Sequence, residues 1–170
     1  SDCRLEVAMG LETAHPATLE KLNKGMTLDQ FADAARWLVG NGISARAFVL
    51  VQPPFMSESM ALHWAQRSTD FAFECGVSVV SLIPTRGGSD TMRELERAGE
   101  FKRPRLSTLE AAHDYGVALD KGRVFADLWD LGQFSDCEIC FDARRDRIEQ
   151  MNLTQRCLPR ISCTRCAVLS

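Results

Sequence analysis

Residues 45–54 read ARAFVLVQPP. Residues 45–51 of this stretch form an apolar run that only Arg46 interrupts, and the prolines at its end terminate it. Residues 77–83 read VSVVSLI and form a second such run, which the turn-forming residues PTRGG follow. Continuous apolar runs of this length are typical of strands that are buried in a parallel sheet. The two runs therefore predict an α/β protein.

Helical patterns lie between these runs and on both sides of them. Thr27 with Gln30 three residues later predicts a capped helix start, Ser57 predicts a second, and Ser107 or Thr108 predicts a third. In residues 4–9, polar and apolar residues alternate weakly, which is a pattern typical of a strand. The predicted strands cover residues 4–9, 45–51, 77–83 and 123–128, and the predicted helices cover residues 16–22, 28–39, 58–75, 91–98 and 108–119.

Alternation of strands and helices predicts parallel strands joined by right-handed crossovers, with the helices outside. An open doubly wound sheet should carry a glycine-rich phosphate turn, but the sequence has neither G-x-G-x-x-G nor a Walker motif. We therefore expect a partial (β/α) barrel of about four parallel strands in residues 1–132. A half barrel leaves one edge bare, so we expect the missing N-terminal half as a partner, or self-association.

The composition fits one globular domain without a membrane-spanning segment. With 170 residues, 45% of them hydrophobic, the chain is long enough to bury a core. Residues 47–57, which no stretch without charge exceeds in length, fall well short of the ~20 apolar residues of a spanning helix. Residues 1–6 carry two acids, unlike the basic start of a secretory signal. We expect a cytoplasmic protein with no membrane partner and, because Met is not the first residue, a piece of a longer one.

Polar residues follow each predicted strand. Strand ends meet solvent in any sheet, and this alone explains polar residues there. In a barrel, however, the carboxyl ends of the strands line the working face, and four polar ends together favour a ligand site. These residues are Glu12, Thr13, Gln52, Thr85, Arg86, Asp127 and Asp130.

The segments EVAMGLET at residues 6–13 and LNKGMT at residues 22–27, with His15-Pro16 between them, resemble the fourth-strand region of radical S-adenosylmethionine enzymes. The similarity covers residues 4–132. It is greatest to the Elongator catalytic-subunit-like branch, which includes the radical subunit of archaeosine synthase and uncharacterised bacterial relatives. The resemblance implies an enzyme that modifies a nucleoside in transfer RNA.

The resemblance also implies site residues. Glu12 or Thr13 would touch the ribose of S-adenosylmethionine, and the backbone from Leu82 to Thr85 would pair with the adenine edge. In the resembled family, a strand with two glycines packs near the adenine of the cofactor. The strand that ends before Gln52 takes its place here, but it contains neither glycine. The cofactor-binding residues implied are Glu12, Thr13, Gln52, Leu82 and Thr85.

Substrate contacts are expected from Arg86, Asp127 and Asp130. An acid pair beside Trp129 could hold a cationic amine, although a core tryptophan flanked by solvent-facing acids would give the same pattern. No catalytic residue is assigned in this chain.

The motif C-x3-C-x2-C, which holds the four-iron four-sulfur cluster of the resembled family, is absent from the sequence. We therefore expect the cluster ligands upstream of this chain, and the chain alone to be inactive. On this interpretation the chain contributes the nucleoside-side wall of the S-adenosylmethionine site.

Two C-x2-C pairs, Cys137/Cys140 and Cys163/Cys166, lie in residues 133–170, which we expect to form a small metal-binding module. Two such pairs let four thiolates converge on one ion, usually a structural zinc. Cys157 could replace one ligand, and free thiols or a disulfide remain alternatives. A closed shell of four thiolates would serve folding rather than catalysis.

The same module is basic, with six arginines against two acids in residues 143–166. Guanidinium groups bind phosphates and stack on bases, so transfer RNA is a candidate partner, although a solvated helix face gives the same composition. The alternative function is therefore a zinc-stabilised nucleic-acid-binding or interaction module on a non-catalytic α/β scaffold. The candidate nucleic-acid residues are Arg144, Arg145, Arg147, Arg160 and Arg165.

Overall fold

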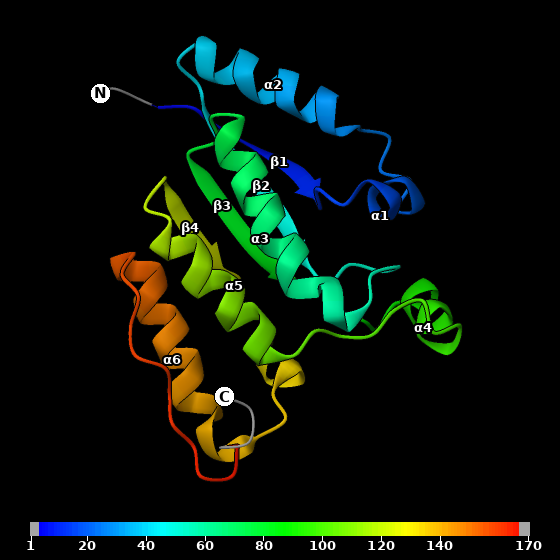
Figure 1. The fold of residues 1–170 in the computed structure, drawn as a ribbon, viewed down its shortest axis with the longest axis vertical. Helices are drawn as coiled ribbons and strands as arrows, with labels where there is room; N and C mark the ends of the chain where they lie inside the picture. Colours follow the sequence, from blue (N-terminus) through cyan, green and yellow to red (C-terminus); the bar gives the residue numbers. More distant parts are fainter. Residues whose placement is uncertain (1–3, 167–170) are drawn as a thin grey trace.

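The computed structural model describes residues 4–166 and contains one four-stranded sheet of order β1-β2-β3-β4 (Figure 1). All three strand pairs are parallel. The predicted α/β class with four parallel strands is therefore confirmed. Residues 1–3 and 167–170, at the ends of the two predicted domains, lie outside the described residues. The strands are β1 (Glu6–Glu12), β2 (Ser44–Val51), β3 (Val79–Pro84) and β4 (Arg123–Ala126).

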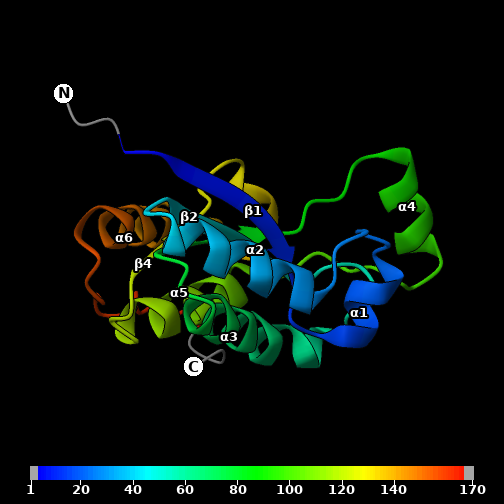
Figure 2. The ribbon, with the colours of Figure 1, turned by 90° about the horizontal axis from the view of Figure 1, so that it is seen from above.

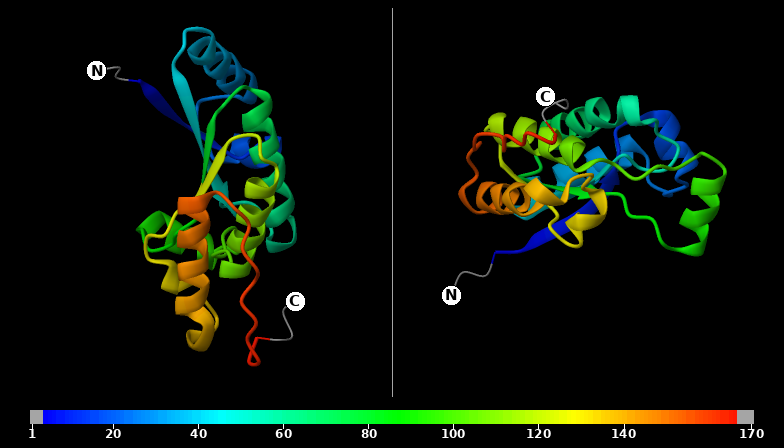
Figure 3. Two further views of the ribbon diagram at one scale, coloured as in Figure 1. Left: turned by 90° about the vertical axis from the view of Figure 1, so that its left-hand side faces the viewer. Right: turned by 90° about the horizontal axis from the view of Figure 1, so that it is seen from below.

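Three helices cover one face of this sheet, and one helix flanks its edge. In Figures 2 and 3, α2, α3 and α5 lie together on one side of the strands, whereas α6 runs beside β4. The short α4 projects beyond the carboxyl end of the sheet and has no buried residue. The helices are α1 (Pro16–Lys21), α2 (Leu28–Gly40), α3 (Glu58–Glu74), α4 (Asp90–Arg97), α5 (Leu106–Ala118) and α6 (Glu138–Thr154), with a 3-10 turn, η1, at Leu131–Phe134.

Alternate residues of β2 face different surroundings. Ala45, Ala47, Val49 and Val51 point under the helices and are fully buried. The intervening residues are only half-buried, because no helix covers them. Arg46 lies on this second face, where its Nε donates to Glu6 at 2.8 Å and its Nη1 donates to Ser81 at 3.0 Å. The sheet therefore has an apolar core face and a partly polar, helix-free face.

The predicted start of α2 is confirmed. Gln30 N donates to Thr27 Oγ1 at 3.2 Å, and Thr27 N donates to Gln30 Oε1 at 2.9 Å, which completes a capping box. In contrast, α5 begins at Leu106, before the predicted caps Ser107 and Thr108. The Leu106 side chain is buried, so packing against the core starts this helix without a side-chain cap.

Helix α6 was not predicted. Its inward stripe contains Ile148 and Met151, which join the core of the sheet domain, but also Arg144 and Arg147. Charged residues at inward positions hide the apolar period that would signal a helix. The described part of the module predicted at residues 133–170 thus packs on the sheet through α6, while its separation as a domain stays a prediction.

The two edges of the sheet differ. Asn152 and Gln155, at the end of α6, hydrogen-bond to backbone groups of Ala126 and Val124 along the outer edge of β4. β1 forms the other edge and has only β2 as a strand neighbour among the described residues. Within residues 4–166, no helix has the length and apolar character that crossing a membrane requires.

Candidate metal centre

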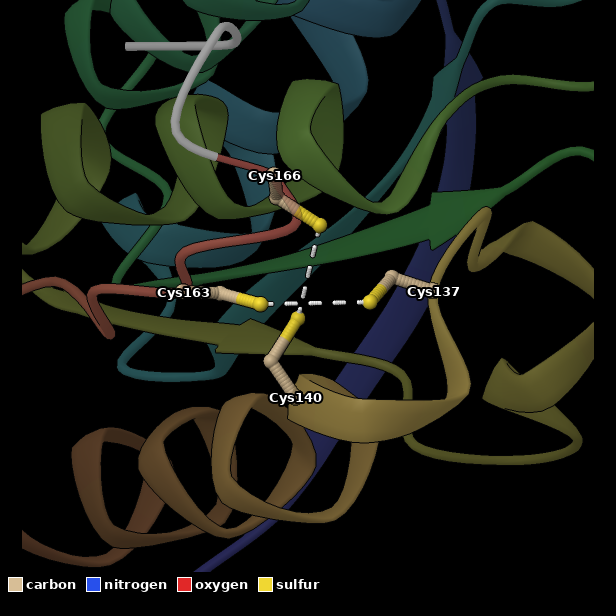
Figure 4. Close-up of side chains that lie close together, drawn as sticks. All are labelled: Cys137, Cys140, Cys163 and Cys166. Carbon is tan, nitrogen blue, oxygen red and sulfur yellow. Dashed lines mark hydrogen bonds between the residues drawn. The ribbon is translucent and has the colours of Figure 1, made fainter.

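Four cysteines from two distant segments meet beside the start of α6 (Figure 4). Cys137 precedes the helix and Cys140 lies in its first turn, whereas Cys163 and Cys166 come from the segment after the helix. All four Sγ atoms lie within 4.8 Å of one another. The predicted pairing of the two C-x2-C motifs is therefore confirmed as a cluster.

The sulfur separations fit a metal-thiolate site. Cys137 Sγ lies 4.0 Å from Cys163 Sγ, and Cys140 Sγ lies 3.8 Å from Cys166 Sγ. Tetrahedral zinc with Zn–S bonds of about 2.3 Å separates its sulfurs by about 3.8 Å. A disulfide requires a separation of about 2.05 Å. The four cysteines are free thiols here, and their donor set can hold a zinc ion.

Cys157 does not belong to this cluster. Its side chain is exposed, and its thiol donates to the backbone oxygen of Asp114 at 3.4 Å. The structure therefore assigns the four positions to the two C-x2-C pairs, and the alternative in which Cys157 replaces a ligand is not supported.

Hydrogen bonds within the cluster favour thiolate at one position. The backbone N–H group of Cys140, at the start of α6, is the main cause that lowers the pKa of the Cys137 thiol to about 6. The hydrogen bond between Cys166 and the Cys137 sulfur is the main cause that raises the pKa of Cys166 to about 12. Without an ion, Cys166 thus keeps its proton. Binding of a divalent metal requires thiolates and would therefore release the remaining protons.

Arg147 fixes the segment that carries the second cysteine pair. Its side chain is 3% exposed, and its Nη2 donates to Asp114 Oδ1 of α5 at 2.6 Å. Its Nε donates to the backbone oxygens of Leu158 at 3.1 Å and Pro159 at 2.9 Å. We call residues 158–166 the cysteine strap. One guanidinium thus ties α6, α5 and the cysteine strap together.

Three of the other four arginines predicted to bind nucleic acid also face acids. Arg144 Nη2 lies 2.5 Å from Glu110 Oε2, and Arg160 Nε lies 3.1 Å from Asp114 Oδ2. Arg145 contacts two acids of its own helix, Asp142 and Asp146. Arg165 is exposed. The basic composition therefore serves internal ion pairs to a large extent, and the nucleic-acid role of these residues stays a prediction.

The predicted cofactor residues lie at the carboxyl edge of the sheet, and most are already engaged. Glu12 forms an ion pair with Lys24. Thr13 is buried and its Oγ1 accepts from His15 N at 3.1 Å. Thr85 Oγ1 donates to the backbone oxygen of Val51 at 3.1 Å.

Leu82 and Gln52 complete this set. The Leu82 side chain points into the core, and its backbone oxygen accepts from Asp127 N at 2.9 Å. Gln52 is fully buried, and its Nε2 donates to the backbone oxygen of Lys102 at 2.8 Å. Its Oε1 has no hydrogen-bond partner within the described residues. The cofactor role of the five residues stays a prediction.

Two of the three predicted substrate residues, Arg86 and Asp127, form an ion pair. Arg86 Nη2 donates to Asp127 Oδ2 at 2.9 Å and to the backbone oxygen of Trp129 at 2.5 Å. Asp127 Oδ1 accepts from Trp129 N at 3.0 Å, so both carboxylate oxygens of Asp127 are partnered. Asp130 Oδ2 accepts from Gln133 at 2.8 Å. The sequence did not indicate that Arg86 and Asp127 pair, because they are 41 residues apart.

Comparisons with known proteins find relatives across most of the chain. Archaeosine synthase subunit beta of Methanosarcina acetivorans is 26% identical over 156 residues, which are 88% of this chain and 45% of that protein. An uncharacterized protein of Methanocaldococcus jannaschii is 24% identical over 162 residues, 91% of this chain and 44% of that protein. The solved structure of archaeal Methanocaldococcus infernus Elp3, with an N-terminal deletion, matches with a TM-score of 0.66 at 15% identity.

The chain is thus similar in fold to Elp3 and in sequence to a subunit of archaeosine synthase. This confirms the predicted resemblance to the Elongator catalytic-subunit-like branch of the radical S-adenosylmethionine enzymes. The Elp3 likeness covers 90% of this chain and 38% of that chain, and at this identity it shows the fold. No protein-family model matches. The chain spans less than half the length of these relatives, so the activity, substrates and partners of a whole protein are proposals.

Proposed function

We propose that this Elp3-like chain forms the nucleoside-side wall of an S-adenosylmethionine site in a radical enzyme that modifies a nucleoside of transfer RNA. The fold likeness to Elp3, over 90% of the chain, is the observation that carries this proposal. A relative that is named as an archaeosine synthase subunit supports the nucleoside substrate. A cytoplasmic location stays a prediction.

Gln52 gives the proposal a ligand contact. The residue directly follows β2, at a positive backbone φ of 55°, and its Oε1 is buried without a hydrogen-bond donor. Leaving a buried acceptor unpaired costs about 1–3 kcal/mol. An exocyclic amino group, such as that of adenine, would satisfy this oxygen. The carboxyl edge of a parallel sheet is also where strand-to-helix loops converge on ligands.

The cysteines of residues 4–166 do not supply the three-cysteine site of the radical iron–sulfur cluster. Four of them form the cluster beside α6, and Cys75 and Cys157 do not belong to it. No reaction step is therefore assigned to this chain, and its proposed part is to bind and orient the nucleoside. The open edge of β1 supports a partner segment that adds a strand there and brings the cluster ligands.

The metal centre has a structural part in this proposal. Four thiolates close the shell of a zinc ion and leave no position for substrate. The ion would join the start of α6 to the cysteine strap, and α6 in turn covers the edge of β4. Zinc would thus stabilise the side of the sheet that lies opposite the proposed partner.

Calorimetric titration of the 170-residue chain with S-adenosylmethionine and with methylthioadenosine tests the proposal. A wall for the nucleoside should bind both with similar affinity, because methylthioadenosine keeps the nucleoside and lacks the amino acid part and the sulfonium charge. Gln52→Leu should weaken both, and Gln66→Leu, on the surface of α3, should weaken neither. Failure of the folded chain to bind methylthioadenosine would contradict the proposal, and RNA binding in that case would favour the non-catalytic zinc module.

A further inference from the structure

A tryptophan stands out from the carboxyl edge of the sheet next to the predicted substrate residues. Trp129 lies three residues after the end of β4, and it is 69% exposed. The Arg86 guanidinium carbon lies 4.7 Å from the centre of the Trp129 ring. It also lies 5.9 Å from the centre of the buried Phe134 ring. Arg86 is thus shared by two aromatic rings, and Trp129 is the one that meets solvent.

The exposure of Trp129 does not come from a loosely held loop. Its backbone oxygen accepts from Arg86 Nη2 and its backbone N–H donates to Asp127 Oδ1, so both main-chain groups are fixed. Arg86 is itself held by Asp127 in an ion pair. The ring therefore has a defined position although most of its surface is in water.

Exposed indole rings bind flat π-systems. A cation against an indole ring is held by the ring quadrupole, at separations below about 6 Å. Because Arg86 occupies one side of Trp129 and the residue is largely exposed, the ring has surface left for another planar group. Nucleobases stack on such rings regardless of sequence, because every base has a π-face.

The charges beside the ring suit a base better than a phosphate. Asp127 and Asp130 flank Trp129 in sequence, and the positive charge of Arg86 is already paired with Asp127. A phosphate group would meet these carboxylates and be repelled, whereas an uncharged base would not. Stacking, rather than charge attraction, is therefore the interaction that this surface favours.

We propose that Trp129 is a stacking platform for an unpaired base of the RNA substrate, with Arg86 and Asp127 as the residues that position it. This inference rests on the proposed function, because it names a contact for the RNA nucleoside. It differs from the predicted nucleic-acid contacts at Arg144, Arg145, Arg147, Arg160 and Arg165, which lie in or after α6.

The chain offers a matched control in Trp37. This residue is 64% exposed, lies near the end of α2, and has no stacked cation among residues 4–166. Because α2 leads back to the start of β2, the end of α2 that carries Trp37 lies toward the amino ends of the strands, away from their carboxyl ends. Removal of Trp37 deletes an exposed indole without touching the proposed platform.

Fluorescence anisotropy with a 5′-labelled single-stranded RNA of ten nucleotides, at one fixed salt concentration, tests the proposal on the full 170-residue chain. Trp129→Ala should weaken binding about fivefold or more, and Trp129→Phe, which keeps a π-face, should bind within about twofold of the parent chain. Trp37→Ala should bind as the parent chain does. Circular dichroism should show the same fold for all three variants.

Equal binding by the parent chain and Trp129→Ala would overturn the platform, as would an equal loss in Trp37→Ala or no RNA binding by the parent chain. The proposed function is tested separately by methylthioadenosine titration. If Trp129→Ala still binds the nucleoside and its RNA affinity is unchanged, the stacking platform is wrong while the proposed function stands.

Discussion

The side-chain amide of Asn152 makes to Ala126 both of the hydrogen bonds that a further strand would make. Ala126 N donates to Oδ1 at 2.9 Å, and Nδ2 donates to Ala126 O at 2.8 Å. Gln155 repeats the pattern at Val124, with distances of 2.8 and 3.1 Å. An unpaired strand edge is a template for another chain. Two side chains of α6 thus close the β4 edge, which leaves β1 as the edge where a strand can add.

Asn152→Ala should therefore lower stability and expose the β4 edge. The backbone N–H and C=O groups of Ala126 would lose their hydrogen-bond partner, and each such loss lowers the free energy of unfolding by about 1–3 kcal/mol. Urea unfolding measures the loss, and sedimentation velocity should detect more self-association. Gln150→Ala, at an exposed position of the same helix, is the control. Equal stability and equal association of both variants would show that the amide does not protect this edge.

Cys163→Ser should abolish tight zinc binding, because it removes one of four thiolates. Elemental analysis of the parent chain should give about one zinc per chain. Cys157→Ser should retain the full content, since Cys157 lies outside the cluster. Zinc loss in Cys157→Ser, or full zinc content in Cys163→Ser, would contradict the assignment of ligands.

Arg147→Lys should weaken zinc binding although Arg147 is not a ligand. Lysine cannot reproduce the planar fork that reaches Asp114 and Leu158 together, so the cysteine strap would be less well placed. Loss of a residue that orients ligands typically costs about 10–100-fold in metal affinity. Competition with a chelator measures this affinity, with Arg145→Lys as control. A purely structural role would lower stability equally with and without zinc.

His113 should make stability depend on pH. The side chain is fully buried, Nε2 contacts Val124 O at 3.2 Å, and burial lowers its pKa from 6.5 to about 4. Between pH 6.5 and pH 4, His113 is protonated in the unfolded chain but stays neutral in the folded chain. Stability should therefore fall from about pH 6.5 to pH 4, by roughly 3 kcal/mol at most, and then level off.

The variant His113→Gln isolates this contribution. It removes the titrating ring but leaves the zinc ligands and the other histidines in place. Urea midpoints at pH 7 and pH 4.5 should differ less for the variant than for the parent chain. Equal differences would mean that His113 has no part in the pH dependence.

The sequence predicts those features that depend on neighbouring residues. Apolar runs gave β2 and β3, the spacing of Thr27 and Gln30 gave a capping box, and the two C-x2-C pairs gave the metal cluster. Short-range patterns suffice for the strands and the capping box, because chain geometry fixes them within a few residues. The two cysteine pairs lie far apart in the chain, and the shared ligand chemistry of two C-x2-C motifs is what predicts that they meet.

The features that depend on long-range pairing were not predictable. Arg144 and Arg147 look like surface charges in the sequence, and only their acidic partners on α5 explain why they face inward. The same arginines made α6 hard to predict from the sequence, because they interrupt the helical period of its apolar residues. Amide pairing along β4 likewise joins residues that are 26 and 31 positions apart.

The location of the nucleoside is the central claim, and NMR of the isotope-labelled chain tests it most directly. Addition of methylthioadenosine should shift the side-chain amide signal of Gln52 and the backbone signals of Thr85 and Arg86, while signals around Cys157 stay in place. Signals that shift only beside the cysteine cluster, or do not shift at all, would contradict the account.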